Sequence, residues 1–210
     1  MRNGRGPASL KVDLHLHSEY SADSSTSLEA LIARCRELGL HRIALTDHNT
    51  AEGALQLARL APELTIVAEE VRTTEGEVVG LFITETIPPR LGPEETMGRI
   101  HEMGGLTYVV HPFDRNRASW SPRRLAELAD SVDIVEVYNP WADSSANRAA
   151  ADFARELDKV TAVGSDAHGL AELGRSWMEI ERFSGAADFL EKLRRARAVI
   201  TDLSGTGRRA

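Results

Sequence analysis

The chain has 210 residues, of which 42% are hydrophobic and 27% are charged, and a formal net charge of −7. These proportions are ordinary for a globular protein, and this length is most simply one domain spanning residues 1–210. The negative charge argues against a dedicated nucleic-acid-binding protein, which usually carries a basic face. No apolar run approaches the roughly 18 residues of a membrane span, and residues 1–10 lack a signal-peptide apolar stretch. We therefore expect a soluble cytoplasmic protein, in which the single cysteine, Cys35, is a buried core thiol.

Short apolar runs alternate with helical patterns along the chain, which predicts an α/β fold with a mostly parallel sheet. Strands are expected at 11–16, 42–45, 65–68, 78–83, 106–110, 134–137 and 160–163, and helices at 28–38, 51–60, 94–103, 122–129 and 145–157. Ser27 and Gly39 are suited to cap the first helix, and Pro93 and Pro122 suit first-turn positions. A further strand (177–180), helix (186–196) and apolar run (198–200) follow, and residues 1–9 and 204–210 are expected to be flexible ends.

Seven or so strand–helix units favour a barrel over an open sheet. Polar residues with metal-binding side chains recur from the first expected strand to the last, and closing a ring brings those strands together. The active sites of such barrels lie at the carboxyl ends of the strands, which is where these residues are found.

Two pairs of polar residues carry the strongest chemical signal. His15 and His17 end the first strand in KVDLHLH, and Asp166 and His168 follow the last one in KVTAVGSDAH. Residues two apart in a strand project from the same face, so each pair can direct two donor side chains into one place. Imidazole and carboxylate donors without thiolates suit Zn, Mn or Fe in a hydrolase rather than a structural zinc site.

Other donor side chains end the strands in between: Asp23 in EYSADSST, Asp47 and His48 in ALTDHN, Glu70 in TIVAEEV, His111 in TYVVHPF and Glu136 in DIVEVYN. Five of the seven histidines end strands, which argues against coincidence, whereas His41 and His101 are expected to be structural or exposed. Asp47 is expected to cap the next helix. Strand alternation lets only one residue of Glu69 and Glu70 face inward, so we expect Glu69 in solvent.

The stretches DLHLHSEYSADS, ALTDHN, VAEEV, VVHPF, IVEVYN and GSDAH together resemble the PHP family, named for polymerase and histidinol phosphatase domains. One His-x-His motif is common, but six motifs in the family's order over most of the chain are specific. The resemblance implies a distorted (β/α)7 barrel with two or three divalent metal ions (Mn, Fe or Zn) in its cleft.

The resemblance also implies a ligand set. His15, His17, Glu70 and Asp166 would hold one metal, Glu70 would bridge to a second at His111, and Asp23, His48 and His168 would hold a third. Asp23 stands where many relatives have a histidine. Many members carry another histidine on the strand after the bridging glutamate, but GEVVGLFIT has none near Val79, so the second site has fewer protein ligands than usual. For Glu136, the roles of ligand, ligand-orienting residue and structural residue stay open, with the orienting role favoured.

Such metals suit phosphoester hydrolysis by a metal-activated water. Arg115 and Arg175 are candidates to clamp a phosphate, against the alternative of ordinary surface arginines, and Asn139 is a further pocket candidate. Asp23 or His48 would be the general acid if the third metal is absent.

The favoured function is a metal-dependent phosphoesterase acting on a small phosphorylated molecule, such as a nucleotide or a sugar phosphate. We expect neither a basic surface nor an appended domain, which argues against a nucleic acid polymer as the substrate. An exonuclease-like activity, as in PHP domains attached to polymerases, and a non-catalytic metal-stabilised ligand-binding domain stay open. Protein phosphotyrosine and histidinol phosphate are further candidate substrates, and the oligomeric state is undetermined.

Overall fold

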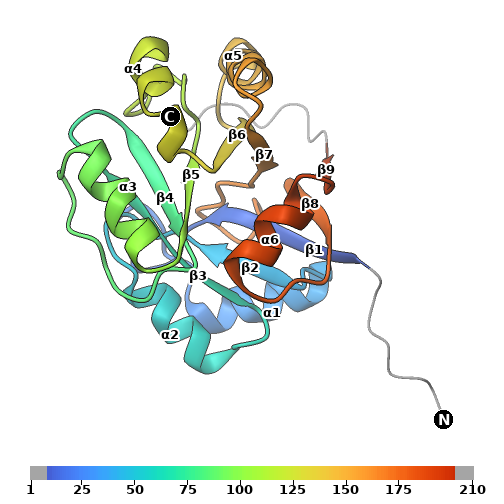
Figure 1. The fold of residues 1–210 in the computed structure, drawn as a ribbon. Helices are drawn as coiled ribbons and strands as arrows, with labels where there is room; N and C mark the ends of the chain where they lie inside the picture. The colour runs from blue at the N-terminus through green and yellow to red at the C-terminus, as the bar shows by residue number, and fades with distance from the viewer. Residues whose placement is uncertain (1–8, 202–210) are drawn as a thin grey trace.

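The structure is a computed structural model that describes residues 9–201 (Figure 1). Nine strands form one sheet in the order β7-β6-β5-β4-β3-β2-β1-β8-β9. The strands are β1 (Ser9–Leu16), β2 (Arg42–Leu45), β3 (Thr65–Arg72), β4 (Glu77–Leu81), β5 (Leu106–Val109), β6 (Ile134–Tyr138), β7 (Val160–Val163), β8 (Ser176–Glu181) and β9 (Arg197–Ile200). The helices are α1 (Leu28–Leu38), α2 (Glu52–Leu60), α3 (Pro93–Glu102), α4 (Pro122–Glu127), α5 (Ser144–Glu156) and α6 (Gly185–Leu193), with a short 3-10 helix η1 (Ala129–Ser131).

The sheet is more mixed than the sequence predicts. Strands β1–β2–β3 and β5–β6–β7 are parallel, but β4 is antiparallel to both β3 and β5. The reason is the short connection after β3: the Thr73 hydroxyl accepts a hydrogen bond from the Gly76 backbone N–H at 3.0 Å and closes a tight turn. So short a connection can join only antiparallel strands. β8 and β9 add a second antiparallel part beside β1.

The sheet curls until the segment after β7 reaches β1, which nearly closes a barrel. The segment that follows β7 lies against β1, where Leu16 and Ala167 form a parallel bridge. The backbone N–H of Asp166 donates to the carbonyl of His15 at 2.7 Å, and that of His17 donates to the carbonyl of Ala167 at 2.8 Å. The first and last donor pairs of the sequence are therefore neighbours, and the distorted barrel is confirmed.

A change of register in β1 sets the direction of its histidines. The pairing of β1 with β2 shifts between Asp13 and Leu16, as at a β-bulge. Leu14 packs in the apolar cluster inside the barrel, whereas Leu16 packs in an outer cluster with α1 and α2. Residues His15 and His17 consequently face the interior, where they meet the side chain of Glu70.

The caps of the first helix are as predicted. The Ser27 hydroxyl accepts from the Ala30 backbone N–H, and Gly39 ends the helix in the left-handed region at φ 67°. Cys35 is fully buried, and burial raises the pKa of its thiol to about 12, as a core residue requires. Within residues 9–201, no helix combines the length and the apolar character that a membrane crossing demands. The flexible ends predicted at 1–9 and 204–210 lie outside the described residues, except for Ser9, which begins β1.

Candidate metal centre

Four side chains from three strand ends meet inside the barrel mouth. The Asp166 Oδ1 atom lies 3.2 Å from His17 Nε2 and 3.5 Å from His15 Nε2. The Glu70 Oε2 atom lies 3.4 Å from the same nitrogen of His15 and 3.5 Å from that of His17. All four residues are buried. This is the group that the sequence analysis expects around a first metal.

Glu70 also connects this group to two others. Its Oε1 atom lies 3.0 Å from His111 Nε2, and its Oε2 atom lies 3.2 Å from His48 Nδ1. Asp23 Oδ2 lies 3.2 Å from His168 Nε2 and 3.5 Å from His48 Nε2. The eight residues expected to bind metal, His15, His17, Asp23, His48, Glu70, His111, Asp166 and His168, therefore form one continuous cluster.

The donor atoms suit divalent ions. Three combinations bring their donor atoms within 4.8 Å of one another: His15 with His17 and Asp166, His15 with Glu70 and His111, and His17 with His48 and His168. Two of these atoms, His17 Nε2 and Asp166 Oδ1, are fully buried without a hydrogen-bond partner. A buried polar atom without a partner is costly, and a coordinated cation satisfies it. The residues present therefore fit the metals that the resemblance implies.

The charges of the cluster are balanced by protons and one arginine. Burial alone would raise the pKa of Asp166, but the His15 charge, the adjacent His17 imidazole and the Arg117 charge hold it well below its usual value. Burial likewise lowers the pKa of His15, but Asp166, Glu136 and Glu70 outweigh it and hold it well above 6.5. Burial lowers the pKa of His17 to about 3, so its imidazole is neutral, which is the form that binds metals.

The Glu136 carboxylate accepts hydrogen bonds from residues of the cluster and from its neighbours. One oxygen accepts from the His15 ring at 3.0 Å and from the Tyr108 hydroxyl at 3.1 Å. The other accepts from the backbone N–H of His111 at 2.7 Å and from Asn139 Nδ2 at 3.1 Å. Asn139 Nδ2 also lies 3.2 Å from Asp166 Oδ2. Glu136 therefore contacts two proposed ligands without joining any of the three donor combinations, which supports its orienting role.

Asp47 does not cap α2, contrary to the prediction. The N-cap of α2 is Ala51, and no side chain bonds there. The buried Asp47 carboxylate instead accepts three hydrogen bonds of 2.7 Å, from the backbone and hydroxyl of Ser18 and from the hydroxyl of Ser21. A buried carboxylate needs such donors, and the serine-rich loop after His17 supplies them. Asp47 thereby fixes the loop that leads to Asp23.

Glu69 is not in solvent, so this prediction is wrong as well. Its side chain is buried beneath the segment that follows β4, where Oε2 accepts from the Ile87 backbone N–H at 2.8 Å. Burial raises the pKa of Glu69 to about 8. The outer face of β3 is covered by loop and helix, a long-range contact that strand alternation does not reveal.

The arginine nearest to the proposed ligands is one that the sequence analysis missed. Arg117 Nη2 lies 2.7 Å from Asp166 Oδ2, and Arg117 Nε lies 3.8 Å from Asp114. Arg115, the expected phosphate clamp, is exposed on the same loop and lines a separate cavity of about 440 Å³ with Phe113. No signal in DRNR distinguishes the two arginines.

The other expected arginine, Arg175, packs on a tryptophan beside the proposed ligand Asp166. Its guanidinium stacks 4.7 Å from the centroid of the Trp141 ring, and the Trp141 indole N–H donates to the carbonyl of Asp166 at 3.1 Å. The two remaining histidines are structural, as expected. His41 Nδ1 accepts from the backbone N–H of Lys11, and His101 Nε2 lies 2.9 Å from an oxygen of Asp133.

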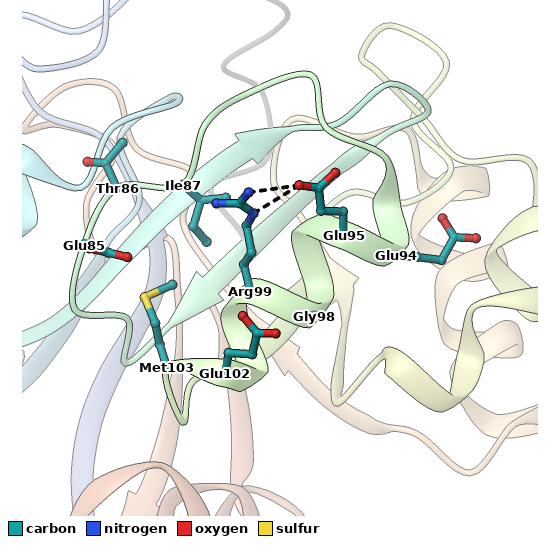
Figure 2. Close-up of a pocket in the computed structure, with 9 residues that line it drawn as sticks. All are labelled: Glu85, Thr86, Ile87, Glu94, Glu95, Gly98, Arg99, Glu102 and Met103. Carbon is teal, nitrogen blue, oxygen red and sulfur yellow. Dashed lines mark hydrogen bonds and ion pairs between the residues drawn. The ribbon is translucent and has the colours of Figure 1, made fainter.

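A cavity of about 730 Å³ lies elsewhere, bordered by Glu85, Thr86, Ile87 and one side of α3. In Figure 2, Arg99, which borders this cavity, points to Glu95; its Nη2 atom donates to Glu95 Oε1 at 2.9 Å. None of the proposed ligands lines it. Size alone therefore does not locate the chemistry of this protein.

Comparison with known proteins decides the family. Residues 13–107 match the PHP domain family, and residues 144–198 match the PHP-associated family. An uncharacterized protein of Methanocaldococcus jannaschii is 33% identical over 143 residues, which cover 62% of this chain and 84% of that relative. The chain belongs to the PHP family. This confirms the resemblance on which the expected ligand set was based.

Solved PHP-like structures share the fold. A two-domain protein from Bacteroides vulgatus, described as containing a predicted PHP-like metal-dependent phosphoesterase, superposes with a TM-score of 0.76 at 18% identity. The match covers 91% of this chain and 65% of that one. The lesion-specific endonuclease PfuEndoQ from Pyrococcus furiosus gives a TM-score of 0.68 at 18% identity, covering 90% of this chain and 57% of that one. At such identities the likeness is one of fold.

Proposed function

We propose that the protein is a metal-dependent phosphoesterase that hydrolyses a small phosphorylated molecule, a nucleotide or a sugar phosphate. The observation that supports this best is that Glu70 joins three donor groups in one buried cluster, beside the guanidinium of Arg117. We further propose that the chain works as a single PHP-like catalytic domain, in the cytoplasm.

The proposed ligand assignment follows the three groups. His15, His17, Glu70 and Asp166 bind the first ion, Glu70 and His111 the second, and Asp23, His48 and His168 the third. When bound, Mn, Fe or Zn ions at such positions lower the pKa of water and offset negative charge on phosphoryl oxygens.

Arg117 is the best candidate to bind the substrate's phosphate. An arginine can donate two parallel hydrogen bonds to phosphate oxygens. In the structure its charge is held by Asp166, and its side chain retains partial exposure of 23%, which leaves it reachable from the cleft. Arg175, stacked on Trp141, is the second candidate. Arg115 points to another cavity and has the weakest support.

His48 and Asp23 are the candidates for proton transfer to the leaving group if the third ion is absent. Burial lowers the pKa of His48, but Glu70 and Asp23 outweigh it and raise it to about 9, so the imidazole holds a proton at neutral pH. Asp23 lies beside it with a half-exposed side chain. A proton on His48 Nε2 thus faces the open side of the cluster.

The test is phosphate release from nucleoside monophosphates, sugar phosphates, an aryl phosphate and a short oligonucleotide. The protein is first stripped with a chelator and then supplied with Mn, Fe or Zn. We expect turnover with one of the small substrates after metal is restored, and none in Asp166→Ala. A preference for the oligonucleotide would favour the nuclease alternative. No release from folded, metal-loaded protein would favour the non-catalytic binding domain.

A matched pair of variants tests the phosphate clamp. Arg117→Ala removes hydrogen bonds to a charged group, each worth about 1.5–3 kcal/mol, so KM should rise roughly tenfold or more. Arg115→Ala, on the same loop, should leave KM within about twofold of the wild type. Equal effects of the two substitutions would contradict the assignment of Arg117.

A further inference from the structure

One buried carboxylate near the second donor group has no role in the ligand set described so far. Glu77 begins β4, and the β3–β4 register pairs it with Arg72 and pairs Val79 with Glu70. Directly paired residues share a face of the sheet, and so do residues two apart in one strand. Glu77 therefore lies on the face that carries Glu70, closer to the barrel mouth.

The burial of Glu77 is not explained by its ion pair. Its side chain is 11% exposed, and within residues 9–201 it forms an ion pair with Arg72, 56% exposed, at 3.5 Å. An exposed arginine at that distance offers little compensation for a carboxylate removed from water. The cost of burying this charge is therefore met only in part by the contacts of the protein.

The backbone at Glu77 is held in place by Trp120. The indole N–H of Trp120 donates to the Glu77 carbonyl at 3.0 Å. The same indole ring fills the space in which a Cβ at Gly76 would stand. The backbone of β4 is thus held at this point, while the three rotatable bonds of the glutamate leave its carboxylate free to turn away from Arg72.

The charged groups that act on Glu77 include Glu70 and His111, the proposed ligands of the second metal. Burial raises its pKa, and the like charge of Glu70 raises it further, while His111 and His48 lower it. The charges of Glu70, His111 and His48 therefore act on the Glu77 carboxylate, as the charge of Arg72 does.

We propose that Glu77 is a protein ligand of the second metal, beside Glu70 and His111. It supplies the donor that strand β4 lacks in the form of a histidine. Two carboxylates and one imidazole make a harder donor set than one with an additional imidazole, which favours Mn over Zn. This inference rests on the proposed metal ligation of Glu70 and His111.

The first test measures Mn²⁺ binding to the metal-stripped 210-residue chain by calorimetry and by metal analysis after dialysis. In Glu77→Gln, one class of Mn²⁺ site should weaken by roughly tenfold or more, and binding at the other sites should persist. Arg72→Gln is the matched control, because it breaks the same ion pair and should leave all Mn²⁺ sites intact. Equal Mn²⁺ binding by Glu77→Gln and wild type would overturn the proposal, as would equal losses in the two variants.

The second test uses Glu77→His, which also serves if the glutamine variant fails to fold. We expect the histidine to restore the second site and to raise its preference for Zn²⁺ relative to Mn²⁺. An unchanged preference for the two ions would contradict a direct ligand. Because both readouts are metal binding, they separate this inference from the proposed function. If Glu77→Gln loses a Mn²⁺ site and the wild type has no phosphoesterase activity, the proposed function is rejected and Glu77 is retained as a ligand. If the wild type is active and Glu77→Gln binds Mn²⁺ normally, the function is retained and the ligand is rejected.

Discussion

Replacing Glu136 by glutamine is the sharpest test of how the centre is organised. The carboxylate accepts four hydrogen bonds, two on each oxygen, from His15, Tyr108, the backbone of His111 and Asn139. A glutamine has one accepting oxygen and one donating NH₂ group. With the NH₂ group toward His111 and Asn139, two buried donors face a group that cannot accept from them. With it toward His15 and Tyr108, the hydroxyl can turn to accept, and the His15 ring is left without its acceptor.

The magnitude follows from one or two lost acceptors. An unsatisfied buried donor costs about 1–3 kcal/mol, so the free energy of unfolding should fall by about 1–6 kcal/mol. For a chain of this size, that corresponds to a decrease of roughly 2–24 °C in Tm. The ring of His15 and the backbone of His111 also lose their fixed orientation, so metal affinity should fall about 10–100-fold.

Urea unfolding and Mn²⁺ titration of wild type, Glu136→Gln and Tyr108→Phe would measure both effects. The phenylalanine variant removes only one hydroxyl from the same network, and it should cost about 1 kcal/mol while leaving Mn²⁺ affinity close to that of the wild type. If Glu136→Gln matched Tyr108→Phe in stability and bound Mn²⁺ as tightly as the wild type, the carboxylate would not orient the ligands.

Two further predictions concern stability. Because the pKa of Glu69 is raised from 4.5 to about 8, the folded state binds one more proton than the unfolded chain between these values, so stability falls as pH rises through that window. The free energy of unfolding of Glu69→Gln, measured in urea relative to that of the wild type, should therefore increase by about 2–5 kcal/mol from pH 5 to pH 8. A difference that does not change with pH would contradict this prediction. Gly76→Ala places a methyl group against the Trp120 ring and should destabilise the protein by about 1–3 kcal/mol. In the control Gly92→Ala, the new methyl group meets nothing within 4 Å and should cost less. Equal decreases in Tm for the two variants would refute the packing argument.

Local chemistry made most of the helices and strands predictable. The first helix begins at Ser27 and ends at Gly39 because a hydroxyl cap and a left-handed glycine are signals within a few residues of the chain. The antiparallel strand β4 was harder, since its direction depends on the tight turn at Thr73 and Gly76 rather than on the apolar pattern of the strand itself. A period-two pattern carries no information about strand direction.

The donor set of the candidate site was predictable in kind, but its supporting contacts were not. Spacing placed His15 and His17 on one face, yet strict alternation from Leu14 would turn both away from the interior, and only the register shift in β1 corrects this. Arg117 reaches Asp166 because consecutive turns fold its loop back toward the cleft. The turns are local, but the ion pair that they make possible joins two loops far apart in sequence.

Backbone conformation at the barrel mouth explains why these contacts matter. Asn49, His111 and Asp166 all have positive φ, at 58°, 29° and 48°. Asn, Asp and His tolerate this region better than most residues, but each still costs of order 1 kcal/mol or more. Their backbone N–H groups donate to the Glu70 carbonyl, the Glu136 carboxylate and the His15 carbonyl, respectively, at 2.7–2.9 Å. The bonds that hold these strained residues therefore end on proposed ligands or on the residue that orients them. The same bonds fix where the donor side chains point. Loss of the Glu136 carboxylate should therefore displace His111, through its backbone N–H, as well as His15, through its ring.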